Sequence, residues 1–510
     1  MERDEGLQDA SWHPWKPACA WLFPHAEQTP SPAEPNSAAK LYYAALLLVL
    51  IAILLPIWIV KYPGLVDYPN HLVRCYILAH YHDNPIWQQR YFLDLSPLPN
   101  LAIDLVVTPL LRLLPLMVCG KLFLSLAAVL YVVGCSEVGR AATGKLNGLA
   151  LVCAFTFYSL PLFQGFVNYI FGLGVFLCAF AYWLQVRNRM TLLRFLLCCL
   201  LSLAAFLAHL AAIAILGAAC FTIAFVEFLR DRKLPRFFAK VAWLACPLLL
   251  VTGYFKGSGH AGTAAWPSLA KKLPALFMPL SSYSLRLNVV IGAVLLVCAV
   301  AILRRSRIHL AAVASLVLLA LFFITPGDLF TGAHVDERYV VPAWLLLVLS
   351  IETRWGRWQK AALAVALAAM LVRTGCITAD WLQISRHDEQ VLAMGDGLPT
   401  GASIYVLQPD AGSTAKLDRG YFHIIQFWTV SHQAGLSSLF ALQGQQPLVS
   451  RQPRCEGPAW AQCFAGYDFV WTYDPPPAIR QVLLGMATPA APWEKVTLWR
   501  VTSAKTRAAE

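Results

Sequence analysis

Ionisable side chains that could perform chemistry gather in two short stretches of this 510-residue chain. The first stretch begins DYPNHLVR and places Asp67, His71 and Arg74 at positions i, i+4 and i+7. A helix through these positions presents all three side chains on one face, where a carboxylate can serve as a general base. The competing interpretation is structural: Asp67 caps this helix and Arg74 pairs with it.

The second stretch, TPGDLFTGAHVDERYVVPAW at residues 325–344, places Glu337, Arg338 and Tyr339 at the beginning of an apolar run. The planar guanidinium of Arg338 can bind a phosphate or a carboxylate through two parallel hydrogen bonds. The alternative is an arginine whose aliphatic stem lies along the membrane interface and whose charge pairs with Glu337.

Other polar residues lie beside apolar segments. Asn168 lies in FQGFVNYIFGLG, whose glycines indicate close helix packing. His209 is more typical of a buried histidine with satisfied hydrogen bonds than of a ligand. The histidines of the polar loops permit a metal site, but no HxxxH or histidine–carboxylate pair indicates one; they are His71, His80, His82, His260 and His334.

Amino-acid composition indicates which kind of structural element positions these residues. Hydrophobic residues make up 58% of the chain and charged residues 13%, roughly half the charged share of about 25% in soluble domains. These values exclude a soluble enzyme, a disordered protein and a fibrous one. Long apolar runs, rather than alternating strands, predict an all-α polytopic membrane bundle. The net charge of +12 lies mostly in short loops between apolar runs, so it does not indicate binding of nucleic acid.

Eleven apolar runs have about the length that a bilayer requires. Residues 1–40 before them are expected to form a flexible tail, and residues 41–380 to form the transmembrane domain. The stretch 101–118 is also apolar, but Asp104 and Arg112 favour a segment that lies on the membrane. The predicted spans are 41–60, 119–138, 146–160, 166–186, 192–208, 211–228, 241–254, 287–303, 310–324, 339–352 and 361–378.

Positive charge separates the loops into two sets. Alternate loops hold 16 Lys and Arg in 40 residues, whereas the loops between them hold 9 in 109. By the positive-inside rule the N-terminus is cytoplasmic, and the loop 61–118 and residues 381–510 are extracytoplasmic. The segments SIYVLQPD, HIIQFWTV, YDFVWTYDPP and WEKVTLWRV are rich in β-forming residues, which predicts a small α/β domain at 381–510. In an oxidising compartment Cys455 and Cys463 are expected to form a disulfide.

Two motifs carry a resemblance to a known class. An acidic residue just after the first span (DYPNH, with Asp67) and Arg-Tyr followed by proline at a late span (ERYVVP, residues 337–342) together resemble the GT-C class of integral-membrane glycosyltransferases. This class includes protein O-mannosyltransferases and the transferases that attach aminoarabinose to lipid A. The layout of spans, large first outer loop and C-terminal domain is similar. One departure is that many members carry two adjacent acidic residues in this loop, whereas Tyr68 follows Asp67 here.

The resemblance implies transfer of a sugar from a polyprenyl-phosphate donor to an extracytoplasmic glycan, lipid or protein at a bacterial inner membrane. Asp67 is then the general base and Arg338 holds the donor phosphate. Lys271 and Lys272, in an outer loop whose glycines and serines suggest a mobile lid, are further phosphate ligands. A divalent metal is permitted but not indicated, and no other cofactor is expected. The remaining substrate-binding candidates are His71, Arg74, Glu337, Tyr339 and Asn168.

Two other functions remain open from the sequence. A transporter or flippase for a lipid-linked glycan predicts ionisable residues at mid-span depth along a path, whereas the apolar runs here are nearly free of charge. A non-catalytic membrane scaffold that displays the C-terminal domain gives no reason for the placement of Asp67 and Arg338.

Overall fold

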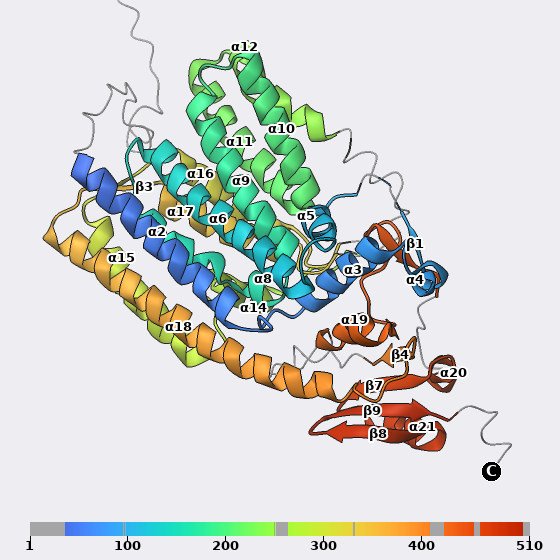
Figure 1. Cartoon of the computed structure of the whole chain (residues 1–510). Helices are drawn as coiled ribbons and strands as arrows, with labels where there is room; N and C mark the ends of the chain where they lie inside the picture. Colours follow the sequence, from blue (N-terminus) through green and yellow to red (C-terminus); the bar gives the residue numbers. More distant parts are fainter. Residues whose placement is uncertain are drawn as a thin grey trace, which may run out of the picture.

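The chain folds into a bundle of apolar helices that carries a small sheet at one end (Figure 1). This arrangement confirms the predicted fold class. The predicted flexible tail lies almost wholly outside the described residues. The computed structural model describes residues 36–502 apart from 95, 97, 249, 251–263, 330–331, 408–422 and 453–459.

Six helices of the described chain are long and apolar enough to cross a bilayer, and each coincides with a predicted span. They are α2 (Asn36–Ile59), α6 (Leu116–Thr143), α9 (Val167–Val186), α11 (Leu210–Asp231), α15 (Leu285–Leu303) and α18 (Arg357–Ala393). Three further predicted spans are shorter helices: α10 (Leu192–Ala208), α16 (Ala311–Ile324) and α17 (Val340–Leu349). The count of eleven spans remains a prediction, because the run at 241–254 extends beyond the described residues.

Two predicted spans differ from the structure. The run at 146–160 is broken into α7 (Leu149–Ala154), η1 (Phe155–Phe157) and α8 (Leu160–Phe163), since Pro161 has no backbone N–H for a continuous helix. Helix α18, expected to end near residue 378, continues to Ala393 because apolar side chains remain buried along one face, among them Trp381, Ile384 and Val391. This helix therefore carries the chain from the bundle into the C-terminal region (Figure 1).

Glycines allow α6 and α9 to approach closely in the centre of the bundle. A Cβ at Gly134 would lie 2.5 Å from the Cβ of Leu177, and a Cβ at Gly174 would lie 2.7 Å from the Cβ of Leu130. Gly174 belongs to the segment FQGFVNYIFGLG, and the close helix packing predicted for that segment is confirmed at this glycine.

The described part of the loop 61–118 contains three short helices and a short strand. They are α3 (Tyr68–His80), α4 (Pro85–Arg90), β1 (Tyr91–Leu93) and α5 (Ala102–Leu110). Helix α5 has 9 residues, a length of about 14 Å, which is too short to cross a bilayer. The prediction that this apolar stretch is not a span agrees with the structure.

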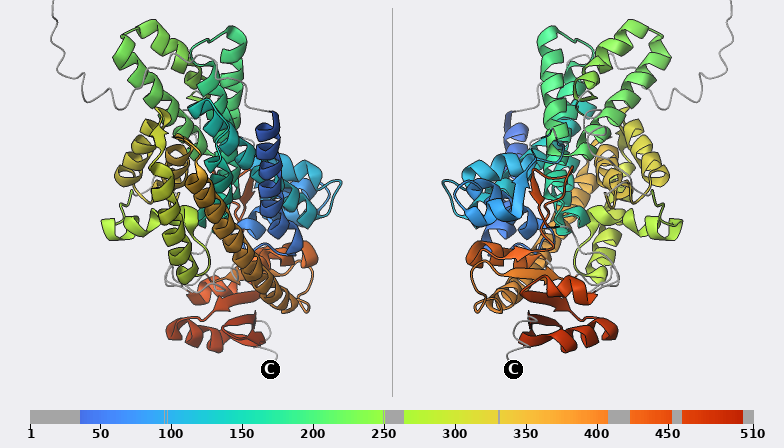
Figure 2. Two further views of the ribbon diagram at one scale, coloured as in Figure 1. Left: turned by 90° about the vertical axis from the view of Figure 1, so that its left-hand side faces the viewer. Right: turned by 90° about the vertical axis from the view of Figure 1, so that its right-hand side faces the viewer.

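The C-terminal region is built on a five-stranded sheet in the order β5-β4-β7-β9-β8. Strand β4 (Ser403–Val406) is parallel to β5 (Gly435–Leu436) and β7 (Phe469–Tyr473), whereas β9 (Val496–Val501) is antiparallel to β7 and to β8 (Ala487–Trp493). Helices α20 (Trp460–Ala465) and α21 (Pro477–Met486) precede β7 and β8 along the chain. The sheet lies at one end of the bundle (Figure 2). Cys463 is disulfide-bonded, and its predicted partner Cys455 lies outside the described residues.

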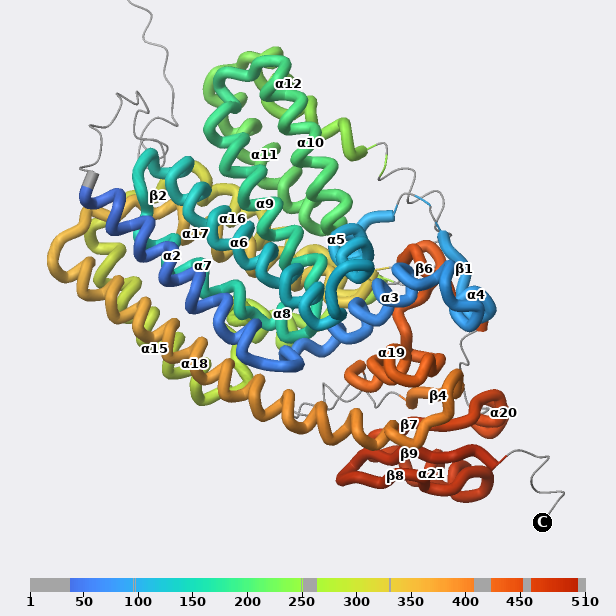
Figure 3. The backbone as a smooth tube through the Cα atoms, in the orientation of Figure 1, coloured from blue at the N-terminus to red at the C-terminus, as the bar shows by residue number. Residues whose placement is uncertain are grey.

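One segment with β-rich composition is helical. HIIQFWTV forms η5 (Ile424–Phe427) and α19 (Trp428–His432), since a short continuous apolar run is compatible with a buried helix as well as with a strand. Further along the chain, β6 (Leu448–Ser450) pairs with β1 of the loop 61–118. The C-terminal region and this loop are therefore joined side by side (Figure 3).

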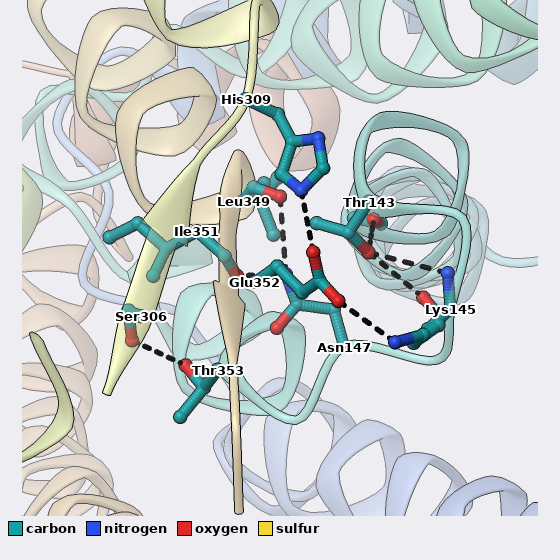
Figure 4. A network of polar contacts seen from close by, with 10 residues as sticks. Thr143, Lys145, Asn147, Ser306, His309, Leu349, Ile351, Glu352 and Thr353 are labelled. Atoms are coloured by element: carbon teal, nitrogen blue, oxygen red, sulfur yellow. Dashed lines mark hydrogen bonds and ion pairs between the residues drawn. The ribbon is translucent and has the colours of Figure 1, made fainter. Parts of the chain in front are cut away.

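Short basic loops lie together at the opposite end of the bundle. Strand β2 (Ser306–Ile308) pairs with β3 (Ile351–Thr353). The carboxylate of Glu352 lies 2.9 Å from both Lys145 Nζ and His309 Nε2 (Figure 4). These contacts join three loops of the set that is richer in Lys and Arg. They lie at the end of the bundle away from the C-terminal sheet.

Candidate functional site

A cavity of about 1260 Å³ lies between α3, α11, the loop before α17 and residues 438–446 of the C-terminal region. Pockets for small ligands usually measure about 300–1,000 Å³, so this cavity has room for a larger molecule. The two polar stretches of the sequence meet at it. Six of the predicted site residues line it: Asp67, His71, Arg74, Asn168, Arg338 and Tyr339.

Asp67 immediately precedes α3, but its side chain does not cap the helix, so its interpretation as a helix cap is wrong. Its backbone N–H donates to the carbonyl oxygen of Gln164 at 3.1 Å. Burial raises the pKa of Asp67 from 3.8 to about 7, and the nearby charge of His334 lowers it in part. A carboxylate with a pKa near neutrality is suited to general base chemistry.

Arg74 pairs with Asp104 of α5 and not with Asp67. Its Nε and Nη2 donate to the two carboxylate oxygens at 2.8 and 2.7 Å, and both side chains are buried. Its third nitrogen, Nη1, is buried without a hydrogen-bond partner among the described residues. An unpartnered buried donor costs free energy, so an acceptor on a ligand in the cavity would stabilise this side chain.

Arg338 lies in η4 (Asp336–Tyr339), immediately before α17. Its Nη1 lies 3.0 Å from Nε2 of His209, and its Nη2 donates to the carbonyl oxygen of Ala333 at 3.2 Å. The guanidinium also lies 5.5 Å from the centre of the Phe166 ring, within the range of a cation–π contact. None of these partners is anionic, so Arg338 brings a positive charge to the cavity.

Three predicted substrate-binding residues do not line the cavity. Glu337 lies 3.1 Å from Nδ1 of His334, so the interpretation of a Glu337–Arg338 pair is wrong. Lys272 is buried, lies 3.0 Å from Asp336 and donates to backbone carbonyls at the end of α16; it fixes the segment that carries Arg338. Lys271 is exposed.

Asn168 connects α9 to the loop 61–118. Its Oδ1 accepts from the backbone N–H of Ile103 at 2.8 Å, and its Nδ2 donates to the carbonyl oxygen of Asn100. The side chain of Asn100 in turn accepts from the N–H of Leu210, at the beginning of α11. These bonds hold α5, α9 and α11 together around the polar end of the cavity.

One wall of the cavity is a strip along α11. Leu210, Ala214, Gly217 and Phe221 recur at the spacing of one helix face and extend over about 16 Å of helix. Phe221 is 49% exposed and Leu248, which also lines the cavity, is 56% exposed. The polar end therefore continues into an apolar groove on a helix long and apolar enough to lie in the bilayer.

Sequence reasoning missed His423, which the C-terminal region places beside Asp67. Its Nε2 lies 3.3 Å from Oδ1 of Asp67, and its Nδ1 lies 2.8 Å from Nδ2 of Asn70. A single histidine at the beginning of HIIQFWTV carries no local signal for partners more than 350 residues earlier in the chain. In the part of the chain that the structure describes, no three His, Cys, Asp or Glu side chains are grouped to hold a metal ion.

The fold is similar to that of a solved membrane protein. No family model and no curated protein sequence matches the chain. The structure of ArnT from Cupriavidus metallidurans bound to undecaprenyl phosphate matches with a TM-score of 0.53 and 11% sequence identity. The match covers 92% of this chain and 98% of that chain. It confirms the resemblance to the GT-C class at the level of the fold.

Proposed function

We propose that the protein is an integral-membrane glycosyltransferase that moves a sugar from a polyprenyl-phosphate donor to an extracytoplasmic acceptor. The observation that carries this proposal is one cavity with Asp67, Arg74 and Arg338 at its polar lining and an apolar groove along α11. A polyprenyl-phosphate sugar has the same division into hydrocarbon chain, anionic phosphate and polar sugar. The fold shared with a protein whose structure holds undecaprenyl phosphate supports the proposal.

In the proposed reaction, Arg338 and Arg74 bind the donor phosphate while the prenyl chain lies along α11. The Asp67 carboxylate removes a proton from the acceptor hydroxyl or amine as that group attacks the anomeric carbon. The bond between this carbon and the phosphate oxygen breaks, and polyprenyl phosphate leaves with the bonding electron pair. The two guanidinium groups offset the negative charge that develops on it, and Asp67 releases the proton to solvent.

The distribution of charge supports an extracytoplasmic site in a bacterial inner membrane. The more basic loops belong in the cytoplasm with the N-terminus, and α18 leads from the basic end of the bundle to the C-terminal sheet. The C-terminal region is then periplasmic, where the disulfide bond of Cys463 is stable. The acceptor is a glycan, a lipid or a protein of that compartment.

The test is a transfer assay with the full-length protein in lipid vesicles. The vesicles receive a panel of radiolabelled polyprenyl-phosphate sugars and a cell-envelope extract as the source of acceptor. Wild-type protein is expected to label the extract, and Asp67→Asn, which keeps the shape of the side chain, is expected to abolish labelling. The matched control is Asp83→Asn, because Asp83 is an exposed carboxylate of the same loop that pairs with Arg112.

Two outcomes of this assay would contradict the proposal. One is the absence of labelling from every donor by the wild-type protein. The other is undiminished labelling by Asp67→Asn, which would remove Asp67 from the mechanism.

A further inference from the structure

The C-terminal region contributes a buried histidine to the polar end of the cavity. His423 precedes η5, which lies against α3, and its Nε2 faces Oδ1 of Asp67 at 3.3 Å. His423 is 7% exposed. The ring of Phe440, which lines the cavity, contacts the rings of both His423 and His71 edge-on. The contact therefore joins a buried histidine to a carboxylate at the wall of the cavity.

Asn70 of α3 determines which nitrogen of His423 carries the proton. The Asn70 amide is fixed by two backbone contacts: its Oδ1 accepts from the N–H of Phe440 at 2.6 Å, and its Nδ2 donates to the carbonyl oxygen of Ser438 at 2.8 Å. Nδ2 also lies 2.8 Å from Nδ1 of His423. An amide nitrogen only donates, so Nδ1 is the acceptor. In a neutral ring the proton then resides on Nε2, the nitrogen that faces Asp67.

The ring is neutral at the pH of a cell compartment. Burial lowers the pKa of His423 to about 4, so the contact with Asp67 is a neutral N–H facing a carboxyl group rather than an ion pair. The other charged or titratable groups that line the cavity with Asp67 are His71 and Arg74 of α3, Tyr169 of α9, His209 immediately before α11, and Arg338 and Tyr339 of η4. His334, in the loop before α17, also acts on Asp67 through its charge.

We propose that His423 is a positioning residue of the active site, which donates a hydrogen bond from Nε2 to the Asp67 carboxylate and so makes the C-terminal region part of the catalytic machinery. This inference rests on the proposed function only in naming Asp67 as the base. A hydrogen bond to the charged form of a carboxyl group favours that form. His423 thus keeps Asp67 available as a base and holds its Oδ1 in a fixed place.

The experiment measures protonation of Asp67 directly, without donor or acceptor. Infrared difference titration of the purified full-length protein in nanodiscs, with the Asp67→Asn spectrum subtracted, gives the titration midpoint of this carboxyl group. His423→Phe removes the N–H donor and keeps a ring, so the midpoint is expected to rise by about one pH unit. His423→Gln keeps an N–H donor, so the midpoint is expected to stay close to the wild-type value.

The control is His432→Gln, a histidine of α19 in the same region that does not line the cavity; its midpoint is expected to match the wild type. If His423→Phe does not fold, His423→Leu removes the same donor with a smaller side chain. The inference is overturned if the midpoint does not move in the folded variant, or if the Gln variant shifts as far as the Phe variant. If the wild-type protein fails the transfer assay but the midpoint shifts in His423→Phe, the proposed function is overturned and the contact between His423 and Asp67 is established.

Discussion

Gly165 lies so close to Asp67 that a side chain does not fit between them. An added Cβ would lie 2.3 Å from the backbone nitrogen of Asp67 and 2.9 Å from its Cα. Gly165 also has a φ of +86°, which residues with a Cβ disfavour. The position of Asp67 at the cavity therefore depends on a glycine about 100 residues later in the chain.

Gly165→Ala is expected to lower both stability and activity. The strained backbone costs about 1–3 kcal/mol, and a displaced carboxylate is expected to slow transfer by roughly 100-fold. Thermal unfolding and the transfer assay check the two effects. Gly375→Ala is the control, because that helical glycine has open space around its Cβ position; it is expected to be neutral or slightly stabilising. Equal behaviour of the two variants would contradict the steric account.

Asp104→Asn is expected to destabilise the protein severely. It leaves the buried guanidinium of Arg74 without its anionic partner, which typically costs about 3–5 kcal/mol. Asp83→Asn removes the partner of Arg112 in an exposed pair and is expected to cost about 1 kcal/mol or less. Unfolding of both variants in detergent micelles, followed by circular dichroism, checks this ranking. Similar losses would show that the Arg74–Asp104 pair does not stabilise the loop 61–118.

Transfer is expected to depend on pH with a midpoint near 7. Burial raises the pKa of Asp67 to about 7, and a base functions only in its deprotonated form. The rate is therefore expected to rise with pH up to about 7 and to fall about tenfold for each pH unit below it. A pH–rate profile at saturating donor checks this. A rate that stays constant between pH 5 and 8 would show that Asp67 does not titrate in the rate-determining step.

Gly217→Leu is expected to block the groove on α11. Among the described residues, a Cβ at Gly217 meets only Leu244, at 3.9 Å, so a leucine fits but occupies the space assigned to an isoprene unit. The affinity for undecaprenyl phosphate is expected to fall by at least about tenfold, whereas dimethylallyl phosphate, which is too short to reach this turn, is expected to bind unchanged. Gly292→Leu, in open space on α15, is the control. Unchanged binding of the long lipid would place its chain elsewhere.

The helical period explains which part of the site could be predicted. Asp67, His71 and Arg74 line one cavity because α3 is a regular helix, and periodicity along the chain is a local property. Their partners could not be predicted, since packing selects them: Asp104 comes 30 residues after Arg74, and His423 comes from the C-terminal region. Lys272 resembled a free cation in the sequence, but its burial against Asp336 is set by the fold.

The fold was predictable where length and apolarity decide it. The long helices follow from runs of bilayer length. The prediction that 101–118 is not a span rested on the cost of Asp104 and Arg112 in a bilayer. The structure has the short helix α5 there, but the buried pairing of Asp104 with Arg74 was not predicted. The continuation of α18 to Ala393 was not predicted, because its last turns are polar on one face. HIIQFWTV was predicted to be β-rich, because short apolar runs do not distinguish strand from helix.

The central claim is that the cavity binds the phosphate of a polyprenyl-linked donor at Arg338. The most direct measurement compares the Kd of the full-length protein in nanodiscs for undecaprenyl phosphate with that for undecaprenol, which lacks the phosphate. The account predicts that wild type prefers undecaprenyl phosphate and that Arg338→Leu loses this preference, with an affinity at least about tenfold lower. Arg286→Leu, an exposed arginine that does not line the cavity, keeps it. Equal affinities of wild type for the two lipids, or an unchanged preference in Arg338→Leu, would contradict the account.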